Sequence, residues 1–288
     1  MTMTINPSIM LKHKPVHSFT DKTVKCSQLN TLNHTTNPTY DTNAFMQARV
    51  QAKSNLTSNG LWVYDKNNRI IPSNAHNIKE LTRMVYPNST TGADAEHNIR
   101  KYYNDVWFNK LTDRQRYALT WYCDYGYASM NAFLDGRNPM AYDAKQYCDD
   151  AMSAMMLTKP LANDVIMYRR IMTDDKVKRP TEELKLYNAL ATSSIMVRKS
   201  FTSTSMVDGV FNHDDYSDTC IIMRVHAGVR GFAVPSDVRN VGIDEHEFIL
   251  APGAHIMVND VLETSPLADS DGLAWAAGHP VIIADVLS

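Results

Sequence analysis

The chain has 288 residues and a nearly balanced formal charge, with 29 Lys and Arg residues against 31 Asp and Glu residues. It carries no basic stripe, which argues against a nucleic acid as an electrostatically bound partner. No apolar run approaches the ~20 residues that cross a bilayer, so no membrane partner is expected either.

Four cysteines lie far apart in the sequence, at Cys26, Cys123, Cys148 and Cys220. Their spacing fits neither a zinc site nor a redox pair, and it is typical of thiols in a reducing compartment. The first residues lack the basic and apolar segments of a secretory signal. The cytoplasm is therefore the expected location.

The composition changes once along the chain. Residues 1–60 are rich in Thr, Asn, Ser and Lys and show no sustained period, which predicts a polar, loosely ordered N-terminal extension. Residues 61–288 are expected to form one domain, with a helical part over about 77–160 and a β-rich part over about 161–288.

Helix signals come first in this domain. Thr112 with Gln115 three residues later has the pattern of a capping box and predicts the start of a helix. Amphipathic segments over 127–134 and 141–157 predict two more helices, and a further helix is expected over 181–196.

Short apolar segments between Gly, Pro and Asp residues then predict strands. They span residues 165–168, 220–225, 231–234, 247–250, 254–258 and 280–286. Helices followed by strands predict an α+β fold.

The common nucleotide and metal motifs are missing: there is no GxGxxG, no GxxxxGK[ST] and no HExxH. His213-Asp214-Asp215 is more typical of a solvated loop than of a metal site. No metal is expected, and any bound nucleotide must be held by other residues.

An acidic pair, Glu245 and Glu247, precedes the apolar segment at 248–250. On a regular strand the two carboxylates would share one face, about 7 Å apart, and His246 would face the other way. Two like charges in this arrangement repel each other, so the pair is more easily explained by chemistry than by packing.

Three strand motifs occur in order: Tyr168-Arg169, then Phe201-Thr202-Ser203-Thr204-Ser205, then Glu245-His246-Glu247 before the apolar segment. Together they resemble the mono-ADP-ribosyltransferases of the arginine–serine–glutamate class, which include binary-toxin enzymes and transferases of T-even bacteriophages. The resemblance covers about residues 77–288, and the domain over 61–288 would then be the catalytic domain. It implies an N-terminal helical bundle against two small, packed, mainly antiparallel β-sheets, with NAD in the cleft between.

The resemblance also implies roles for these residues. Arg169 would bind a phosphate of NAD through its forked guanidinium. Arg170 alternates to the other face of the strand, where it is either solvated or paired with a carboxylate, or else makes a second phosphate contact. Ser203 would orient Glu247, which would contact the ribose 2′-hydroxyl and stabilise the oxocarbenium-like cation. Glu245 would select arginine as the acceptor, because a carboxylate can bind a guanidinium and take its proton.

Other NAD contacts are implied for Tyr127, Asn131 and Thr204. Tyr122, Tyr127 and Asn131 repeat a Tyr-x4-Tyr-x3-Asn spacing of the binary-toxin branch. Phe211 is either a ring against nicotinamide or a local core residue.

The chain departs from the class in two places. Lys199-Ser200 stands where Gly often precedes the serine motif, and residues 236–244 contain no aromatic side chain. The second departure argues against Rho and actin as targets. The expected partners are host or cellular proteins with an exposed arginine, for example in a bacterium infected by a phage.

Three other functions remain open at this point. An NAD glycohydrolase would use Arg169, Ser203 and Glu247 with water as acceptor. A catalytically silent binding module would keep the fold alone. A glycoside hydrolase would also use paired carboxylates, but one strand rarely supplies both groups across a sugar.

Overall fold

The structure is a computed structural model that describes residues 62–64, 70–72, 78–171, 181–208, 219–235, 238, 245–263 and 280–288. The predicted extension over 1–60 and the candidate residue Phe211 lie outside the described residues.

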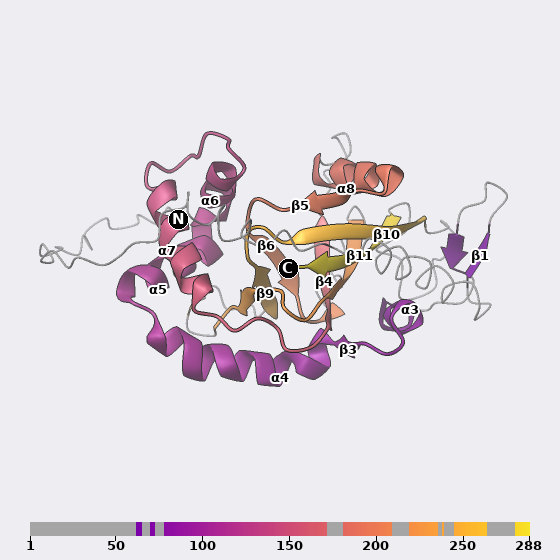
Figure 1. The fold of residues 1–288 in the computed structure, drawn as a ribbon, viewed down its shortest axis with the longest axis horizontal. Helices are drawn as coiled ribbons and strands as arrows, with labels where there is room; N and C mark the ends of the chain where they lie inside the picture. The colour runs from indigo at the N-terminus through magenta and orange to yellow at the C-terminus, as the bar shows by residue number, and fades with distance from the viewer. Residues whose placement is uncertain are drawn as a thin grey trace, which may run out of the picture.

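The helical part has most of its helices at one end of a sheet, one helix below the sheet and one toward the sheet's other end (Figure 1). Its elements are α3 (Ile78–Val85), α4 (Gly92–Tyr102), η1 (Tyr103–Trp107), η2 (Phe108–Lys110), α5 (Asp113–Trp121), η3 (Tyr122–Gly126), α6 (Tyr127–Leu134) and α7 (Ala144–Met156). The helix α8 (Thr181–Thr192) follows the first long strand and packs against strands β10 (His255–Glu263) and β5 (Ile195–Val197).

The strands are β1 (Trp62–Tyr64), β2 (Ile70–Pro72), β3 (Thr90–Thr91), β4 (Val165–Ile171), β5 (Ile195–Val197), β6 (Thr202–Ser205), β7 (Thr219–Val225), β8 (Gly231–Ala233), β9 (Glu247–Leu250), β10 (His255–Glu263) and β11 (Pro280–Leu287). β1 and β2 form a separate hairpin. The others form one sheet in the order β5-β10-β11-β7-β4-β6-β9-β8, with β3 paired to β4. The predicted α+β class is confirmed.

The sheet is mainly antiparallel, and only the described pairs β11–β7 and β3–β4 are parallel. Its two halves meet where β4 pairs with β6, and the register there joins Tyr168 to Ser205. The two sheets of the prediction are thus linked into one, because the short strand β6 pairs along its length with β9 and touches β4 at one end.

Local signals account for several element boundaries. Thr112 accepts a hydrogen bond from the Gln115 backbone and the Gln115 side chain caps in return, as the capping-box pattern predicts. The helix expected over 181–196 is too long by four residues. It ends at Thr192 because Ser193 adopts a left-handed conformation (φ 52°), and residues 195–197 pair with β10 instead.

Aromatic side chains connect the helices to the sheet. Trp107 is fully buried, lies 5.3 Å from the ring of Phe232, and donates a hydrogen bond to the carbonyl of Ala154. Tyr103 donates to the carbonyl of Gly231 at 2.7 Å. A Cβ at Gly231 would lie 2.4 Å from the Phe248 ring, so only glycine allows this close approach of β8 and β9. The helical part is therefore held in a fixed position against β8 and β9.

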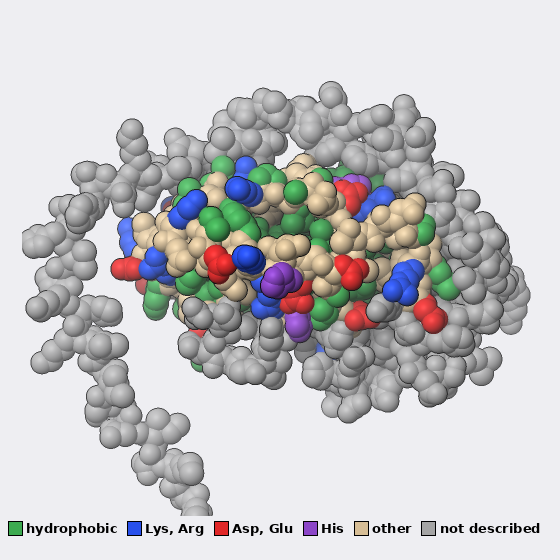
Figure 2. Space-filling view, turned by 90° about the horizontal axis from the view of Figure 1, so that it is seen from below, with side chains coloured by type: hydrophobic (Ala, Val, Ile, Leu, Met, Phe, Trp, Pro, Cys, Tyr) green, Lys and Arg blue, Asp and Glu red, His purple; other side chains and the backbone are tan. Residues whose placement is uncertain are grey.

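Acidic, basic and histidine side chains are interspersed on the face seen from below (Figure 2). Among the described residues, no helix combines the length and apolar character needed to cross a membrane.

Candidate active site

The sheet order brings the three sequence motifs together, because β6 lies between β4 and β9. β4 carries Arg169, β6 carries Ser203 and β9 begins at Glu247. Arg169 and Glu247, which are 78 positions apart in the sequence, thus lie on the two strands that flank β6.

Ser203 and Glu247 are joined by a hydrogen bond from the serine hydroxyl to the Oε1 atom of the carboxylate. The register explains this contact. Ser205 lies directly opposite Glu247, and Ser203, two residues away, projects from the same face of β6. The serine therefore fixes the carboxylate's orientation within the sheet.

The guanidinium of Arg169 lies beside this pair and is mostly buried, with 18% of the side chain exposed. Its Nη1 atom donates to the backbone oxygen of Ser203 at 2.6 Å. Its Nε and Nη2 atoms donate to both carboxylate oxygens of Glu182 on α8, at 3.1 and 3.0 Å. This bidentate pair locks the plane of the guanidinium.

The structure corrects the expected geometry of the acidic pair. β9 begins at Glu247, so Glu245 and His246 precede the strand and the period-two argument does not apply to them. His246 adopts a left-handed conformation (φ 50°), and its Nδ1 atom lies 2.6 Å from Glu96 of α4. The Ser205 hydroxyl lies 3.0 Å from the backbone oxygen of Glu245 and 2.9 Å from that of Val207, two acceptors that share its one proton, and this contact keeps the exposed Glu245 close to β6.

In the helical part, Tyr122 lies near Arg169 and Glu247, and Asn131 contacts Tyr122. Asn131 donates to the Tyr122 hydroxyl at 3.4 Å, and the Tyr122 ring lies edge-on to Phe201, 4.9 Å away. Burial raises the pKa of Tyr122, the Asn131 bond opposes this, and the charges of Glu247 and Arg169 also act on it. Tyr122 opens the π-helical turn η3, a departure from regular helix of the kind often found at functional sites.

Tyr127 begins α6 directly after this turn, and its side chain is 56% exposed. It is one turn of helix before Asn131, so both residues belong to the same short stretch of surface.

The side chains of two further candidates, Thr204 and Arg170, project away from the Ser203–Glu247 pair. Thr204 is buried, and its hydroxyl donates to the backbone oxygen of Phe248 at 2.6 Å and contacts the sulfur of Met167 at 3.4 Å. Its side chain therefore points into the core, because it alternates with Ser203 along β6, and its contact with NAD stays a prediction.

Arg170 follows Arg169 on β4, so its side chain leaves the strand on the opposite face. That face also carries Tyr168, whose hydroxyl lies 3.2 Å from Thr82 of α3. Alternation thus separates Arg170 from the Ser203–Glu247 pair.

Sequence reasoning missed two residues, Glu182 and Arg198. The Nη1 atom of Arg198 lies 3.2 Å from the Glu182 Oε1 atom, and its Nε donates to the Thr202 hydroxyl at 3.1 Å. Burial raises the pKa of Glu182, but Arg169 and Arg198 together hold it below its ordinary value. No motif marks these residues, because they come from a helix and from the segment after a short strand.

The group of Arg169, Arg198 and Glu182 holds two cations and one anion, and it is half-buried beside the Ser203–Glu247 pair. Such a surplus of forked donors fits a pyrophosphate well. Within the described residues, no cluster of His, Cys, Asp and Glu side chains could hold a metal ion.

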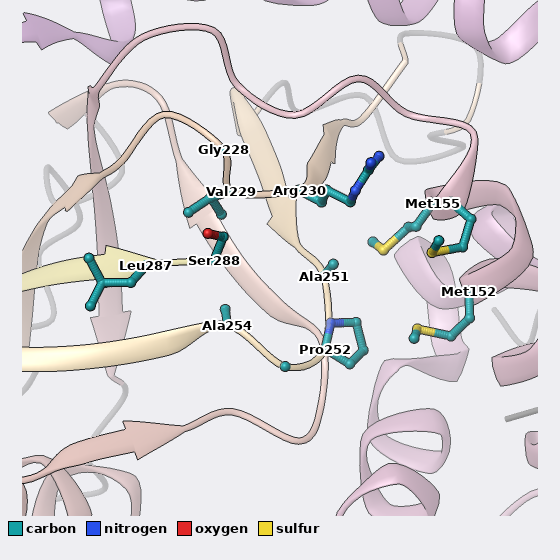
Figure 3. Close-up of a pocket in the computed structure, with 12 residues that line it drawn as sticks. Met152, Met155, Gly228, Val229, Arg230, Ala251, Pro252, Ala254, Leu287 and Ser288 are labelled. Atoms are coloured by element: carbon teal, nitrogen blue, oxygen red, sulfur yellow. The ribbon is translucent and has the colours of Figure 1, made fainter. Parts of the chain in front are cut away.

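A separate cavity of about 150 Å³ lies between α7 and the turn at 251–254 (Figure 3). Met152 and Met155 face Pro252 across it, and Arg230 lies at its edge. Neither Arg169 nor the Ser203–Glu247 pair lines this cavity, so it is not part of the site.

The comparisons with known proteins concern the family and the fold of the chain. The ADP-ribosyltransferase exoenzyme family matches residues 96–275. The fold resembles BECa, an ADP-ribosylating toxin of a C. perfringens binary enterotoxin solved with NADH (TM-score 0.52, 14% identity, 69% of this chain and 50% of that chain). It also resembles the Clostridium limosum C3 exoenzyme (TM-score 0.50, 12% identity, 69% of this chain and 97% of that chain).

At these identities the structural likeness concerns the fold alone, and the chain matches about half the length of BECa. No curated protein sequence matches the chain. The family match nevertheless covers more than half of the 288 residues. The chain therefore belongs to the ADP-ribosyltransferase exoenzyme family, whose members use NAD as the source of ADP-ribose.

Proposed function

We propose that this protein transfers ADP-ribose from NAD to arginine side chains of other proteins and releases nicotinamide. The observation that carries the proposal is the hydrogen bond from Ser203 to Glu247, with the Arg169 guanidinium bonded to the backbone of the same serine. The Glu247 carboxylate and the Arg169 guanidinium are thus held side by side. NAD requires both charges, because its pyrophosphate is anionic and its ribose becomes cationic during the reaction.

In the proposed reaction, the bond between the ribose anomeric carbon and the nicotinamide nitrogen breaks, and its electron pair leaves with nicotinamide. The ribose then carries cationic character, which the Glu247 carboxylate stabilises at a fixed position. The serine hydroxyl reduces the reorganisation that this carboxylate needs during the step. Arg169 binds the phosphates at the other end of the substrate.

Glu245 is proposed to bind the acceptor. A guanidinium has a pKa above 12 and is a poor nucleophile until it loses a proton. Glu245 is exposed and stands directly ahead of Glu247, so a protein arginine can reach it from solvent. Its carboxylate would hold the guanidinium and take the proton while the guanidinium nitrogen forms the new bond to the anomeric carbon.

The proposed targets are proteins of the cytoplasm, including that of a bacterium infected by a phage. The basis of this proposal is the sequence spacing of the four cysteines, which is typical of thiols in a reducing compartment.

The proposal is tested with NAD labelled in its adenylate half and a bacterial lysate, with Glu247→Gln as the inactive control. Nicotinamide release and label on protein are followed together. Label on discrete proteins, absent with the control and located on arginine by mass spectrometry, supports the transferase. Label on another residue type refutes arginine specificity. Nicotinamide release without protein label, even on an arginine-rich test protein, indicates a glycohydrolase.

A further inference from the structure

We infer that Arg198 is a second pyrophosphate-binding residue for NAD, acting beside Arg169, and that Arg170 does not have this role. The inference rests on the proposed use of NAD, and it concerns a residue outside the three sequence motifs. It is carried by the ion pairs that Arg169 and Arg198 both make with Glu182.

The backbone of Arg198 is fixed independently of its side chain. Its N–H donates to the carbonyl of Ala254 at 2.8 Å, and its carbonyl accepts from the N–H of Gly253 at 2.6 Å. Both partners belong to the turn that joins β9 to β10. The side chain therefore starts from a rigid position, and its replacement leaves these two bonds in place.

The Arg198 side chain is 14% exposed and is directed by two contacts. Its Nε atom donates to the Thr202 hydroxyl, and its Nη1 atom faces Glu182. The remaining terminal nitrogen, Nη2, takes part in neither contact. Thr202 is the first residue of β6, so the Arg198 guanidinium is held at the start of this strand, and the shared Glu182 brings it close to Arg169.

The charge balance of this group favours an anion. Two guanidinium groups share the single Glu182 carboxylate, which leaves one positive charge in excess among the three residues. Burial lowers the pKa of Arg198, Glu182 opposes this, and the like charge of Arg169 lowers it further. A pyrophosphate, in which each phosphate carries a negative charge, would relieve this repulsion while accepting hydrogen bonds from both forks.

Arg170 provides the contrast. It lies next to Arg169 in sequence, but strand alternation sends its side chain to the face of β4 that carries Tyr168. Arg198 lies 29 residues away in sequence and meets Arg169 at a common partner. Arg198 and Arg170 thus form a matched pair for mutation, with the same side-chain chemistry but with only Arg198 sharing the partner of Arg169.

The test compares Arg198→Gln with Arg170→Gln. For each variant, steady-state nicotinamide release is measured at varied NAD, and binding of ADP-ribose and of nicotinamide riboside is measured by calorimetry. Arg198→Gln is expected to raise the KM for NAD and the Kd for ADP-ribose by about ten- to a hundredfold, which is the usual effect of losing a charged hydrogen bond. The kcat value and the affinity for nicotinamide riboside, which has no phosphate, should stay within a few-fold of wild type. Arg170→Gln should leave all four values unchanged.

Equal effects of the two variants, or an unchanged ADP-ribose affinity in Arg198→Gln, would overturn the inference. The thermal unfolding temperature of each variant is also measured, because it shows whether a weaker affinity for ADP-ribose reflects a loss of folding. Should Arg198→Gln unfold, Arg198→Lys keeps the charge without the fork and is expected to bind ADP-ribose more weakly than wild type. Wild-type affinity in the lysine variant would also overturn the assignment.

The control Glu247→Gln distinguishes this inference from the proposed function. If it stays active while Arg198→Gln loses ADP-ribose affinity, the catalytic assignment fails and the binding assignment stands. If Glu247→Gln is inactive and Arg198→Gln binds normally, the reverse holds.

Discussion

Ser203 donates a hydrogen bond from its hydroxyl to the carboxylate of Glu247 across the β6–β9 pair. The contact is diagonal in the sheet, because Ser205 and not Ser203 lies directly opposite Glu247. The two serines of the motif therefore have different partners: Ser203 holds the carboxylate of Glu247, and Ser205 holds the backbone oxygen of Glu245.

The first prediction concerns the different roles of Ser203 and Ser205. Ser203→Ala should lower kcat for nicotinamide release by about ten- to a hundredfold, since a hydrogen bond to a charged group contributes ~1.5–3 kcal/mol. Protein transfer should fall by the same factor, because both reactions need Glu247. Ser205→Ala should instead lower transfer more than hydrolysis. Equal ratios of transfer to hydrolysis in the two variants would contradict the division.

The second prediction concerns the acceptor. Glu245→Gln should remove arginine modification and spare most of the nicotinamide release, because an amide can neither carry the matching charge nor take a proton. Both activities are measured on one arginine-rich test protein. A parallel loss of both would mean that Glu245 acts on NAD itself.

The third prediction concerns the backbone at His246. The left-handed conformation costs a residue with a Cβ ~1–2 kcal/mol, and glycine avoids this cost. His246→Gly and His246→Ala both remove the contact with Glu96, so the alanine variant should be less stable than the glycine variant by ~1 kcal/mol in urea unfolding. Equal stabilities would show that the residue relaxes out of this conformation in the variants.

The fourth prediction concerns pH and the buried carboxylate of Asp285 on β11. Burial raises its pKa, but hydrogen bonds from His226, Arg224 and Asn259 outweigh this, so the pKa is lowered on folding. A depressed folded-state pKa stabilises the fold above the unfolded value of ~4, and this stability is lost as the pH falls through the lower folded value. The free energy of unfolding should therefore drop as acid is added below about pH 4.

Asp285→Asn should cost ~3–5 kcal/mol at neutral pH, because Arg224 loses its buried partner, and should flatten the acid dependence. Asp149→Asn is the matched control, since the Lys145–Asp149 pair lies at the surface and contributes little. If the free energy of unfolding of Asp285→Asn fell with the same slope in acid as that of the wild type, groups other than Asp285 would be responsible for the loss of stability.

The fifth prediction separates stability from the site. Thr112→Ala removes the capping box of α5 and should cost ~1 kcal/mol of folding free energy. Thr112 contacts none of the candidate site residues in the described structure, so kcat and KM should be unchanged at temperatures where the variant is folded. A changed KM for NAD would show that α5 is coupled to the site.

Much of this protein could be predicted from the sequence because the relevant signals are local. The capping box at Thr112 and Gln115 depends on residues three positions apart, and the alternation that separates Arg169 from Arg170 is a property of any strand. The apolar runs of β4, β7 and β11 likewise follow from burial on a sheet. The same alternation turns the side chain of Thr204, which belongs to the serine motif, toward the core.

The sequence by itself determined the helices α5, α6 and α7, the strands β4, β7, β9 and β11, and the residues of the three motifs, since each depends on a few neighbouring positions. Only the tertiary structure decided that β6 lies between β4 and β9, that His246 turns Glu245 out of the strand, and that Glu182 joins Arg169 to Arg198. The physical reason is register: which side chains meet depends on how distant strands and helices align, and a shift of one residue would send each of them to the other face.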